Sequence, residues 1–370
     1  MRIPVSAPAL DGNEESYVVR AIRSSWISSS GEFVERFEKE FAEFAGTRYA
    51  LSVCNGTIAL HLALLGLDLR PGDEVLVPSL TYIATANAVR YVGAAPVFVD
   101  VDPNTWCIDP RKLEDCITSR TKAIVAVHLY GHPADMDAIN KFAAVHGLSV
   151  IEDAAEAHGA RYKGRPAGNL SSVAAFSFYG NKVMSCGEGG AVTLNDPHLY
   201  MRLKTLRGQG MDPERRYYFP IIGYNFRLTN LACALLCAQL ERYEILIARR
   251  RHLANLYDQL LGATPGIGLQ PRSPDVQITP WLTCITVDEA RYGRSRDDLA
   301  RLLDEQGIET RPFFIPIHSL PPYREHGRTK KGDFAVTEAL ARTGLNLPLY
   351  PGMRDANVER VCAVIAEGAC

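Results

Sequence analysis

Short β-rich runs alternate with helical patterns between about residues 50 and 195, and this alternation restricts the possible folds more than any other feature of the chain. The β-rich runs are EVLVPSL, APVFVDVD, KAIVAVHLY, LSVIEDAA, SVAAFSFY and GAVTLN. One of the patterns between them, DMDAINKFAAVHG, predicts a helix that ends at Gly147. Such a rhythm is typical of an α/β domain with a mostly parallel sheet covered by helices on both faces. Ligands in such sheets bind at the carboxyl ends of the strands.

The remainder of the chain predicts a second, smaller unit. Residues 230–261 form one long helical pattern, and a mixture of predicted strands and helices follows it. The 370 residues are enough for a large domain and a smaller one. We therefore expect a large domain over residues 1–235 and, over 236–370, a long linking helix with a small C-terminal α+β domain.

Charge and hydropathy limit the partners of the chain. The formal net charge is −2, so no overall field attracts nucleic acid or an anionic membrane. The first residues do not resemble a secretory signal, and no apolar run approaches the ~18 residues that a membrane-spanning helix needs. We expect a cytoplasmic protein that binds neither nucleic acid nor membrane.

The tripeptide Asn55-Gly56-Thr57 comes directly before a predicted helix. Glycine allows a ligand to approach the backbone closely, and the free N–H groups and positive dipole end of a helix attract an anion. A phosphate would be bound there. An ordinary helix N-cap by Asn55 or Thr57 explains the same residues and stays open.

Asp153 ends the apolar run LSVIED, where its carboxylate would emerge from a buried strand. Burial of such a charge is costly unless a cation meets it. The protonated pyridine nitrogen of pyridoxal phosphate (PLP) is such a cation, and the pairing keeps the ring an electron sink. Glu156, three residues later, would then accept a hydrogen bond from or donate one to the phenolic oxygen of that cofactor. A helix N-cap at Asp153 with a capping box through Glu156 remains the alternative.

Lys182 follows the predicted strand SVAAFSFY and precedes the glycine-rich segment at residues 187–190. A lysine in such a turn suits Schiff-base formation, because desolvation and a nearby cation lower its pKa and free the amine as a nucleophile. Most lysines are instead solvated surface residues. Ser177 on the same strand offers a hydroxyl to a phosphate or to the backbone, and Tyr82 would stack on the pyridine ring or fill the core.

These residues lie within longer motifs that resemble one family nearly from end to end. The motifs are SVCNGTIALHLALLGL, PGDEVLVPSLTYIATANAVRYVGAAPVFVDVDP, VHLYGHPADMDAI, VIEDAAEAHGARYKG, AAFSFYGNKVMSCGEGGAVT and GYNFRLTN. The chain resembles the DegT/DnrJ/EryC1/StrS sugar aminotransferases, which are fold-type I PLP enzymes. The resemblance implies an α/β fold with a mostly parallel central sheet and a smaller C-terminal α+β domain.

The resemblance also implies a role for each candidate residue. Lys182 would form the Schiff base with PLP, Asp153 would pair with the pyridinium, Glu156 would contact the phenolic oxygen and Tyr82 would stack on the ring. The phosphate would be held by Gly56, Thr57 and Ser177. Asn225, in GYNFRLTN, would reach the phosphate of a neighbouring subunit, which implies a homodimer with active sites shared between its subunits.

The implied reaction moves an amino group from L-glutamate to a keto-deoxysugar nucleotide. GDP-4-keto-6-deoxymannose, converted to GDP-perosamine, is the first expectation, and a dTDP-linked or 3-keto sugar is the alternative. Met184-Ser185-Cys186 departs from the pattern of the family members that form GDP-perosamine and leaves the substrate open. Lys182 argues against the sugar dehydratases that carry histidine at this position. The expected substrate contacts are Trp26, Arg216, Arg311, His318 and Tyr323.

Two readings from other classes compete with an aminotransferase. A PLP-binding regulator would keep the lysine-bound cofactor without turnover, but the chain has no DNA-binding motif or basic appendage. A metal-dependent enzyme would use His128 and His132, which are four residues apart. We expect no metal, because these two histidines fall across a strand end and a turn rather than on one helix face.

Overall fold

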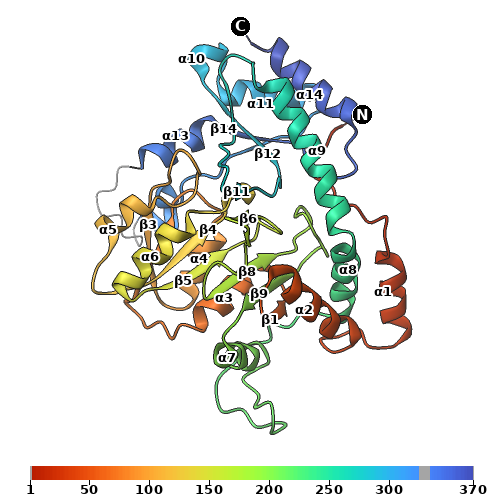
Figure 1. The fold of residues 1–370 in the computed structure, drawn as a ribbon, viewed down its shortest axis with the longest axis vertical. Coiled ribbons are helices and arrows are strands. Elements are labelled where there is room, and N and C mark those ends of the chain that lie inside the picture. The colour runs from red at the N-terminus through yellow and green to blue at the C-terminus, as the bar shows by residue number, and fades with distance from the viewer. Residues whose placement is uncertain (1, 325–333, 370) are drawn as a thin grey trace.

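The centre of the molecule is a seven-stranded sheet, shown by a computed structural model that describes residues 2–324 and 334–369 (Figure 1). Its spatial order is β1 (Tyr49–Val53), β9 (Gly190–Leu194), β8 (Val173–Ser177), β5 (Ser149–Asp153), β4 (Thr121–Val127), β2 (Glu74–Pro78) and β3 (Ala95–Val99). Strand β9 runs antiparallel to both of its neighbours, and the other adjacent pairs are parallel. Strands β4, β5 and β8 are almost continuously buried, as expected for a sheet covered on both faces.

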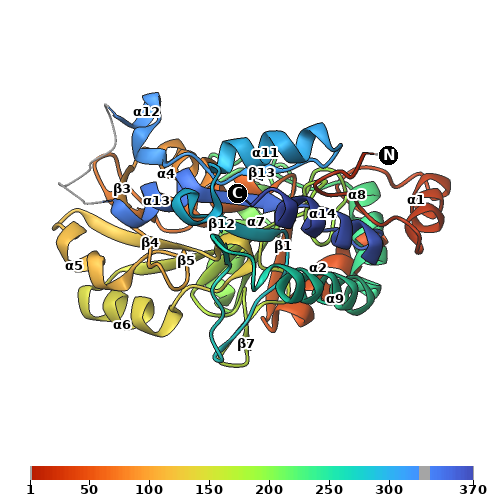
Figure 2. The ribbon, with the colours of Figure 1, turned by 90° about the horizontal axis from the view of Figure 1, so that it is seen from above.

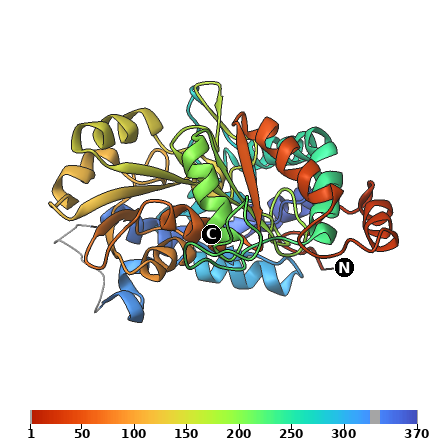
Figure 3. The same ribbon diagram turned by 90° about the horizontal axis from the view of Figure 1, so that it is seen from below.

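Helices lie on both sides of this sheet. The α-helices are α1 (Glu14–Arg23), α2 (Glu32–Ala45), α3 (Gly56–Leu65), α4 (Ala84–Tyr91), α5 (Leu113–Cys116), α6 (Met136–His146), α7 (Pro197–Arg207), α8 (Asn230–Glu241), α9 (Tyr243–Leu261), α10 (Glu289–Tyr292), α11 (Arg296–Glu305), α12 (Pro321–Arg324), α13 (Ala335–Thr343) and α14 (Asp355–Glu367). Short 3₁₀ turns occur at η1 (Pro110–Lys112), η2 (Leu129–Gly131) and η3 (Ile317–Ser319). Helices α5 and α6 cover one face and α4 lies on the other (Figure 2), while α7 stands at the centre of the view from below (Figure 3).

An aromatic cluster packs α2 against β8 and the segment that follows it. The rings of Phe41 and Phe176 meet edge to face with centroids 5.0 Å apart, and Phe41 and Phe178 do the same at 5.2 Å. Such pairs each stabilise a fold by about 0.5–1.5 kcal/mol beyond the burial of their area. The cluster therefore anchors the strand from which the chain continues to Lys182.

The long helical pattern at residues 230–261 is two helices rather than one. Helix α8 ends at Glu241 and α9 begins at Tyr243, because the backbone of Arg242 leaves the helical region with φ −103° and ψ 5°. Its guanidinium donates to both carboxylate oxygens of Asp11, at 2.7 and 3.1 Å. The expected single linking helix is corrected in this respect, since amphipathic spacing alone does not reveal one non-helical residue.

The C-terminal part contains a smaller antiparallel sheet in the order β10 (Ile267–Leu269), β12 (Thr283–Val287), β14 (Gly344–Leu347) and β13 (Arg311–Pro312). A third sheet joins β11 (Val276–Gln277), β6 (Arg161–Tyr162) and β7 (Arg165–Pro166). Most buried apolar residues in the described part of the chain belong to two clusters, and α9 contributes Ile247 to one and Leu253 to the other. The domain boundary at residue 235 stays a prediction. No helix in the described part of the chain is long and apolar enough to cross a bilayer.

Candidate active site

A cavity of about 560 Å³ opens at the carboxyl ends of β5 and β8. Its lining unites eight of the thirteen residues that we singled out from the sequence: Gly56, Thr57, Tyr82, Asp153, Glu156, Ser177, Lys182 and Arg311. The first seven come from the large sheet and its loops, and Arg311 comes from β13 of the small sheet. The cavity therefore lies where the two sheets face each other.

Asp153 is the last residue of β5, and its side chain is buried. One carboxylate oxygen accepts a hydrogen bond of 2.7 Å from the Thr85 hydroxyl, and the other accepts one of 3.2 Å from the backbone N–H of Ala155. Burial raises the pKa of Asp153, and these two bonds lower it. Both donors are neutral, so a cation in the cavity would stabilise the ionised carboxylate further.

Lys182 lies opposite this carboxylate in a largely enclosed position. Its Nζ is 3.5 Å from Oε1 of Glu156 and 3.9 Å from the ring centroid of Trp281. Burial lowers the pKa of Lys182, while the Glu156 and Asp153 carboxylates act in the opposite direction. The second oxygen of Glu156 accepts a hydrogen bond of 2.7 Å from the backbone N–H of Tyr130, which fixes the carboxylate. A lysine with a lowered pKa in such surroundings can act as a nucleophile or a base.

The N-terminus of α3 forms the cavity wall next to Ser177. Asn55 caps the helix, because its side chain accepts a hydrogen bond of 2.9 Å from the N–H of Ile58. The helix N-cap by Asn55 that the sequence suggested is therefore present. The other N–H groups of the first helical turn have no partner within the helix and stay available to an anion. A β-carbon on Gly56 would come within 2.6 Å of the Ser177 β-carbon. Glycine is therefore required for this close approach.

Five of the residues singled out from the sequence lie outside the lining of this cavity. Asn225 and Arg216 belong to the connection between α7 and α8, and Trp26 follows α1 with 60% of its surface exposed. His318 contacts the Ser79 hydroxyl at 2.7 Å, and the Tyr323 hydroxyl donates to Asn87 at 2.6 Å. The last two are bound to neighbouring protein groups, and their predicted roles toward a sugar stay predictions.

Three further residues shape the site but were not singled out from the sequence. Thr85 orients Asp153, and the only sequence signal for it was its position in the motif that contains Tyr82. Trp281 and Asn346 enter the cavity lining from the C-terminal part of the chain. The Trp281 indole donates to the carbonyl of Asn181 at 2.8 Å, so it contacts the segment that carries Lys182.

The two histidines considered as metal ligands are engaged with protein groups. His128 Nε2 lies 3.0 Å from the buried carboxylate of Glu152, and its Nδ1 accepts from the N–H of Ala134 at 3.1 Å. His132 Nδ1 lies 2.7 Å from the carbonyl of Pro133. These contacts account for His128 as a structural residue of the β4 and β5 strand ends.

The residues that line this cavity fit PLP. The buried Asp153 carboxylate would meet a ring cation, Lys182 would meet an aldehyde, and the glycine-lined start of α3 would meet a phosphate. Together, the sheet and this cavity define a PLP-dependent aminotransferase of fold type I.

Comparisons with known proteins agree with this class and make it more specific. The model of the "DegT/DnrJ/EryC1/StrS aminotransferase family" matches residues 8–366. The chain is 48% identical over 368 residues to GDP-perosamine synthase of Caulobacter vibrioides, covering 98% of this chain and 97% of that one. A structure of DesV from S. venezuelae superimposes with a TM-score of 0.90 at 41% identity, covering 96% and 94% of the two chains. The chain belongs to the DegT/DnrJ/EryC1/StrS aminotransferase family. The expected fold class, reaction type and cofactor are confirmed.

Proposed function

We propose that this enzyme transfers the amino group of L-glutamate to the keto carbon of GDP-4-keto-6-deoxymannose in the cytoplasm and forms GDP-perosamine. The observation that carries the proposal is the likeness over nearly the full length to GDP-perosamine synthases. Besides the Caulobacter vibrioides protein, those of Escherichia coli O157:H7 and Vibrio cholerae are 44% and 39% identical to this chain, with 98% of each relative covered. The cavity supports the reaction type, and the likeness supports the substrate.

Different residues of this chain would have different roles in amino transfer. PLP, when bound, supplies an electron sink for the carbon that gains or loses the amino group. Asp153 would hold the proton on the ring nitrogen, and Thr85 and the N–H of Ala155 keep its carboxylate in place. Gly56, Thr57 and Ser177 would bind the phosphate at the N-terminus of α3.

Lys182 would both hold the cofactor and move protons. Its Nζ would bind the cofactor covalently. As a free amine, Lys182 would take and return a proton at the reacting carbon. Trp281 and Glu156 limit the movement of Nζ, because both side chains contact it. Arg311, with its guanidinium at the cavity, would bind a carboxylate of glutamate or the diphosphate of the sugar nucleotide.

A dTDP-linked sugar is the rival substrate. The dTDP-3-amino-3,4,6-trideoxy-alpha-D-glucose transaminase of Streptomyces venezuelae is 43% identical over 341 residues, covering 92% of this chain and 88% of that one. The two candidate substrates differ in the sugar carbon that would gain the amino group, which is C4 for GDP-4-keto-6-deoxymannose and C3 for a 3-keto sugar. A regulator without turnover is disfavoured, because the chain belongs to an aminotransferase family.

Turnover with a set of keto-sugar nucleotides tests the substrate proposal. We expect GDP-4-keto-6-deoxymannose with L-glutamate to give a 4-amino sugar, with a kcat/KM about 100-fold or more above that for dTDP-linked 3- and 4-ketosugars. The physical reason is that polar groups built for one nucleotide are left unpaired by another. The product is identified by mass spectrometry and by NMR, which distinguishes amination at C3 from amination at C4.

Two results would contradict this proposal. A higher kcat/KM for a dTDP-linked or 3-keto sugar would assign another substrate. Glutamate alone could change the visible absorption of the bound cofactor while no sugar in the set is aminated. That result would support an aminotransferase but contradict a keto-sugar nucleotide as its acceptor.

We also propose that the active unit is a homodimer with shared active sites. The connection between α7 and α8 extends away from the body of the molecule at the bottom of Figure 1. It exposes a run of large apolar side chains, with Tyr217 at 74% and Ile222 at 89% of their surface. Exposed apolar surface of this kind is typical of an interface. Asn225 lies in the same connection, bridged to Gly208 and outside its own cavity, which supports a role in the cavity of a partner.

Mixed dimers provide the test of shared sites. Lys182→Ala and Asn225→Asp are each expected to inactivate the homodimer, the second because a carboxylate repels the phosphate. Co-expression of the two chains should restore about one quarter of the wild-type activity, since half of the dimers are mixed and one of their two sites is intact. The measurement is turnover per cofactor together with the mass of the assembly by sedimentation.

Co-expression of Lys182→Ala with Asp153→Asn is the matched control. Both of these residues line the cavity of their own chain, so the mixed dimer has no intact site and activity stays at the level of the separate variants. A monomer in sedimentation, or no recovery with Asn225→Asp although mixed dimers form, would reject the shared site.

A further inference from the structure

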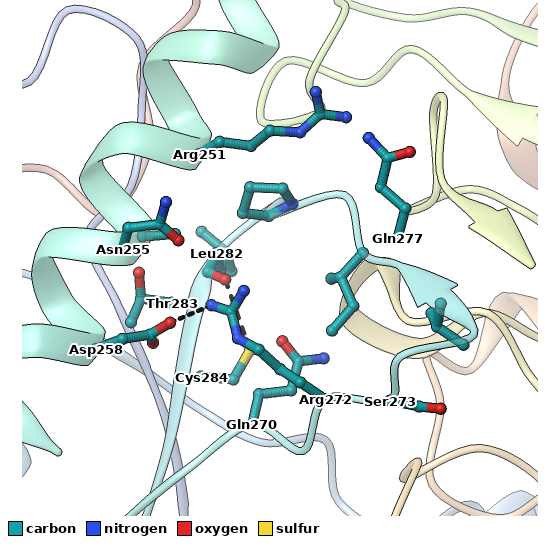
Figure 4. A pocket seen from close by; sticks show the side chains of 14 residues that line it. Arg251, Asn255, Asp258, Gln270, Arg272, Ser273, Gln277, Leu282, Thr283 and Cys284 are labelled. Atoms are coloured by element: carbon teal, nitrogen blue, oxygen red, sulfur yellow. Dashed lines mark hydrogen bonds and ion pairs between the residues drawn. The ribbon is translucent and has the colours of Figure 1, made fainter. Parts of the chain in front are cut away.

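A second cavity, of about 350 Å³, lies between α9 and the segments that lead into β12 (Figure 4). Helix α9 supplies Arg251, Ala254, Asn255 and Asp258 to its lining, and the chain from Gln270 to Cys284 supplies the rest. Several of the lining side chains are exposed, so the cavity is open to solvent on one side. Leu282 lines this cavity and the active-site cavity, so the two share a wall.

The two arginines of the cavity differ in their pairing. Arg272 forms an ion pair with Asp258. Burial raises the pKa of Asp258, and the positive charge of Arg272 lowers it. Arg251 extends along one side of the cavity in Figure 4 and has no acidic partner within ion-pair distance in the described part of the chain. One guanidinium is therefore available to an anion, with donors in a fixed planar arrangement.

The neutral lining groups point to a ligand with many hydroxyls. Asn255 and Gln277 contribute amides that both donate and accept hydrogen bonds, and Gln270, whose Nε2 donates to the carbonyl of Tyr130 at 3.4 Å, contributes an acceptor oxygen. Thr283 is 7% exposed, and among residues 2–324 and 334–369 its hydroxyl has no hydrogen-bond partner. A buried hydroxyl without a partner is costly, and a ligand in this cavity can supply the missing bond.

The composition of the lining excludes other ligand classes. None of its fourteen residues is aromatic, so a nucleobase would find no ring to stack on. The volume lies near the lower end of the range for small-molecule sites. We propose that this cavity is a binding site for a hexose monophosphate, with the phosphate at Arg251 and the sugar hydroxyls at the amides and Thr283. This site is separate from the catalytic cavity and does not depend on the proposed substrate.

Calorimetric titration of the holoenzyme with mannose 1-phosphate tests this site. We expect one ligand per chain, and about tenfold weaker binding in Arg251→Met because the only unpaired guanidinium of the lining is lost. Thr283→Val, which keeps the shape and removes the hydroxyl, should weaken binding severalfold. Inorganic phosphate should bind at least about tenfold more weakly than the sugar phosphate, since the amides then have no hydroxyls to bond.

Two control variants separate this cavity from the alternatives. Arg291→Met removes an exposed arginine of α10 outside the cavity and should leave the affinity unchanged, and melting curves verify that each variant is folded. Arg311→Met alters the catalytic cavity. Loss of binding in Arg311→Met with retention in Arg251→Met would place the ligand in the catalytic cavity and overturn the proposal. Equal affinity for inorganic phosphate, or no measurable heat with mannose 1-phosphate, would overturn it as well.

Discussion

Lys182→Ala is expected to lose the visible absorption of the lysine-bound cofactor and about 10⁴-fold or more of the turnover rate. General acid–base catalysis by one side chain contributes about 10²–10⁴-fold, and covalent binding of the cofactor is lost in addition. The cavity keeps the start of α3 and the Asp153 carboxylate, so the variant should still bind PLP without a covalent bond. Absorption spectra, equilibrium binding of PLP and turnover measure the three effects separately.

A chemical label gives a direct measure of the same assignment. Borohydride reduction of the wild-type holoenzyme should fix the cofactor to the peptide that contains Lys182, as detected by mass spectrometry. Lys141→Ala, which removes an exposed lysine of α6, should leave colour, labelling and turnover unchanged. Labelling at another lysine, or a coloured and active Lys182→Ala, would contradict the role of Lys182.

Asp153→Asn is expected to bind PLP and to lower kcat on the order of 100-fold, comparable to the loss of one preorganised electrostatic contact in an active site. The neutral amide cannot stabilise a proton on the ring nitrogen as the carboxylate does. The KM for the sugar nucleotide should change little, because Asp153 ends β5 and would contact the cofactor rather than the substrate. Steady-state kinetics and the absorption spectrum of the bound cofactor report on these two properties.

A graded series makes the Asp153 result specific. Thr85→Val keeps the carboxylate and removes its hydrogen bond of 2.7 Å, so its loss of kcat should be smaller than that of Asp153→Asn. Asp115→Asn changes an exposed carboxylate of α5 and serves as the neutral control. Unchanged kcat and an unchanged cofactor spectrum in Asp153→Asn would show that this carboxylate does not tune the ring.

The sequence was most informative where function depends on strand ends. Asp153 and Ser177 each close a buried apolar run, and the parallel pairing of β5 with β8 brings those two ends together. Periodicity predicts this edge because neighbouring parallel strands end on the same side of a sheet. Family resemblance then distinguished a cofactor site from the capping motifs that the same residues also suit.

The remainder of the site depends on contacts that no local pattern encodes. Trp281, Arg311 and Asn346 enter the cavity from the C-terminal part of the chain, roughly 100 residues or more beyond Lys182 in the sequence. Arg250 on α9 is a second example of a residue whose position the local sequence does not predict. A basic helical pattern indicates exposed arginines, whereas this one is fully buried. Its guanidinium donates to the carbonyls of Trp281 and Leu349 at 2.8 and 3.0 Å, which links the long helix to the catalytic cavity.

The burial of the Asp153 carboxylate connects binding of the cofactor to the acidity of the medium. Burial raises the pKa of this carboxyl, so it keeps its proton to a higher pH than an exposed aspartate does. A protonated ring stabilises the ionised carboxylate, so by linkage the protonation of Asp153 at falling pH opposes binding of the cationic ring. The same carboxylate that serves catalysis thus makes retention of the prosthetic group sensitive to acid.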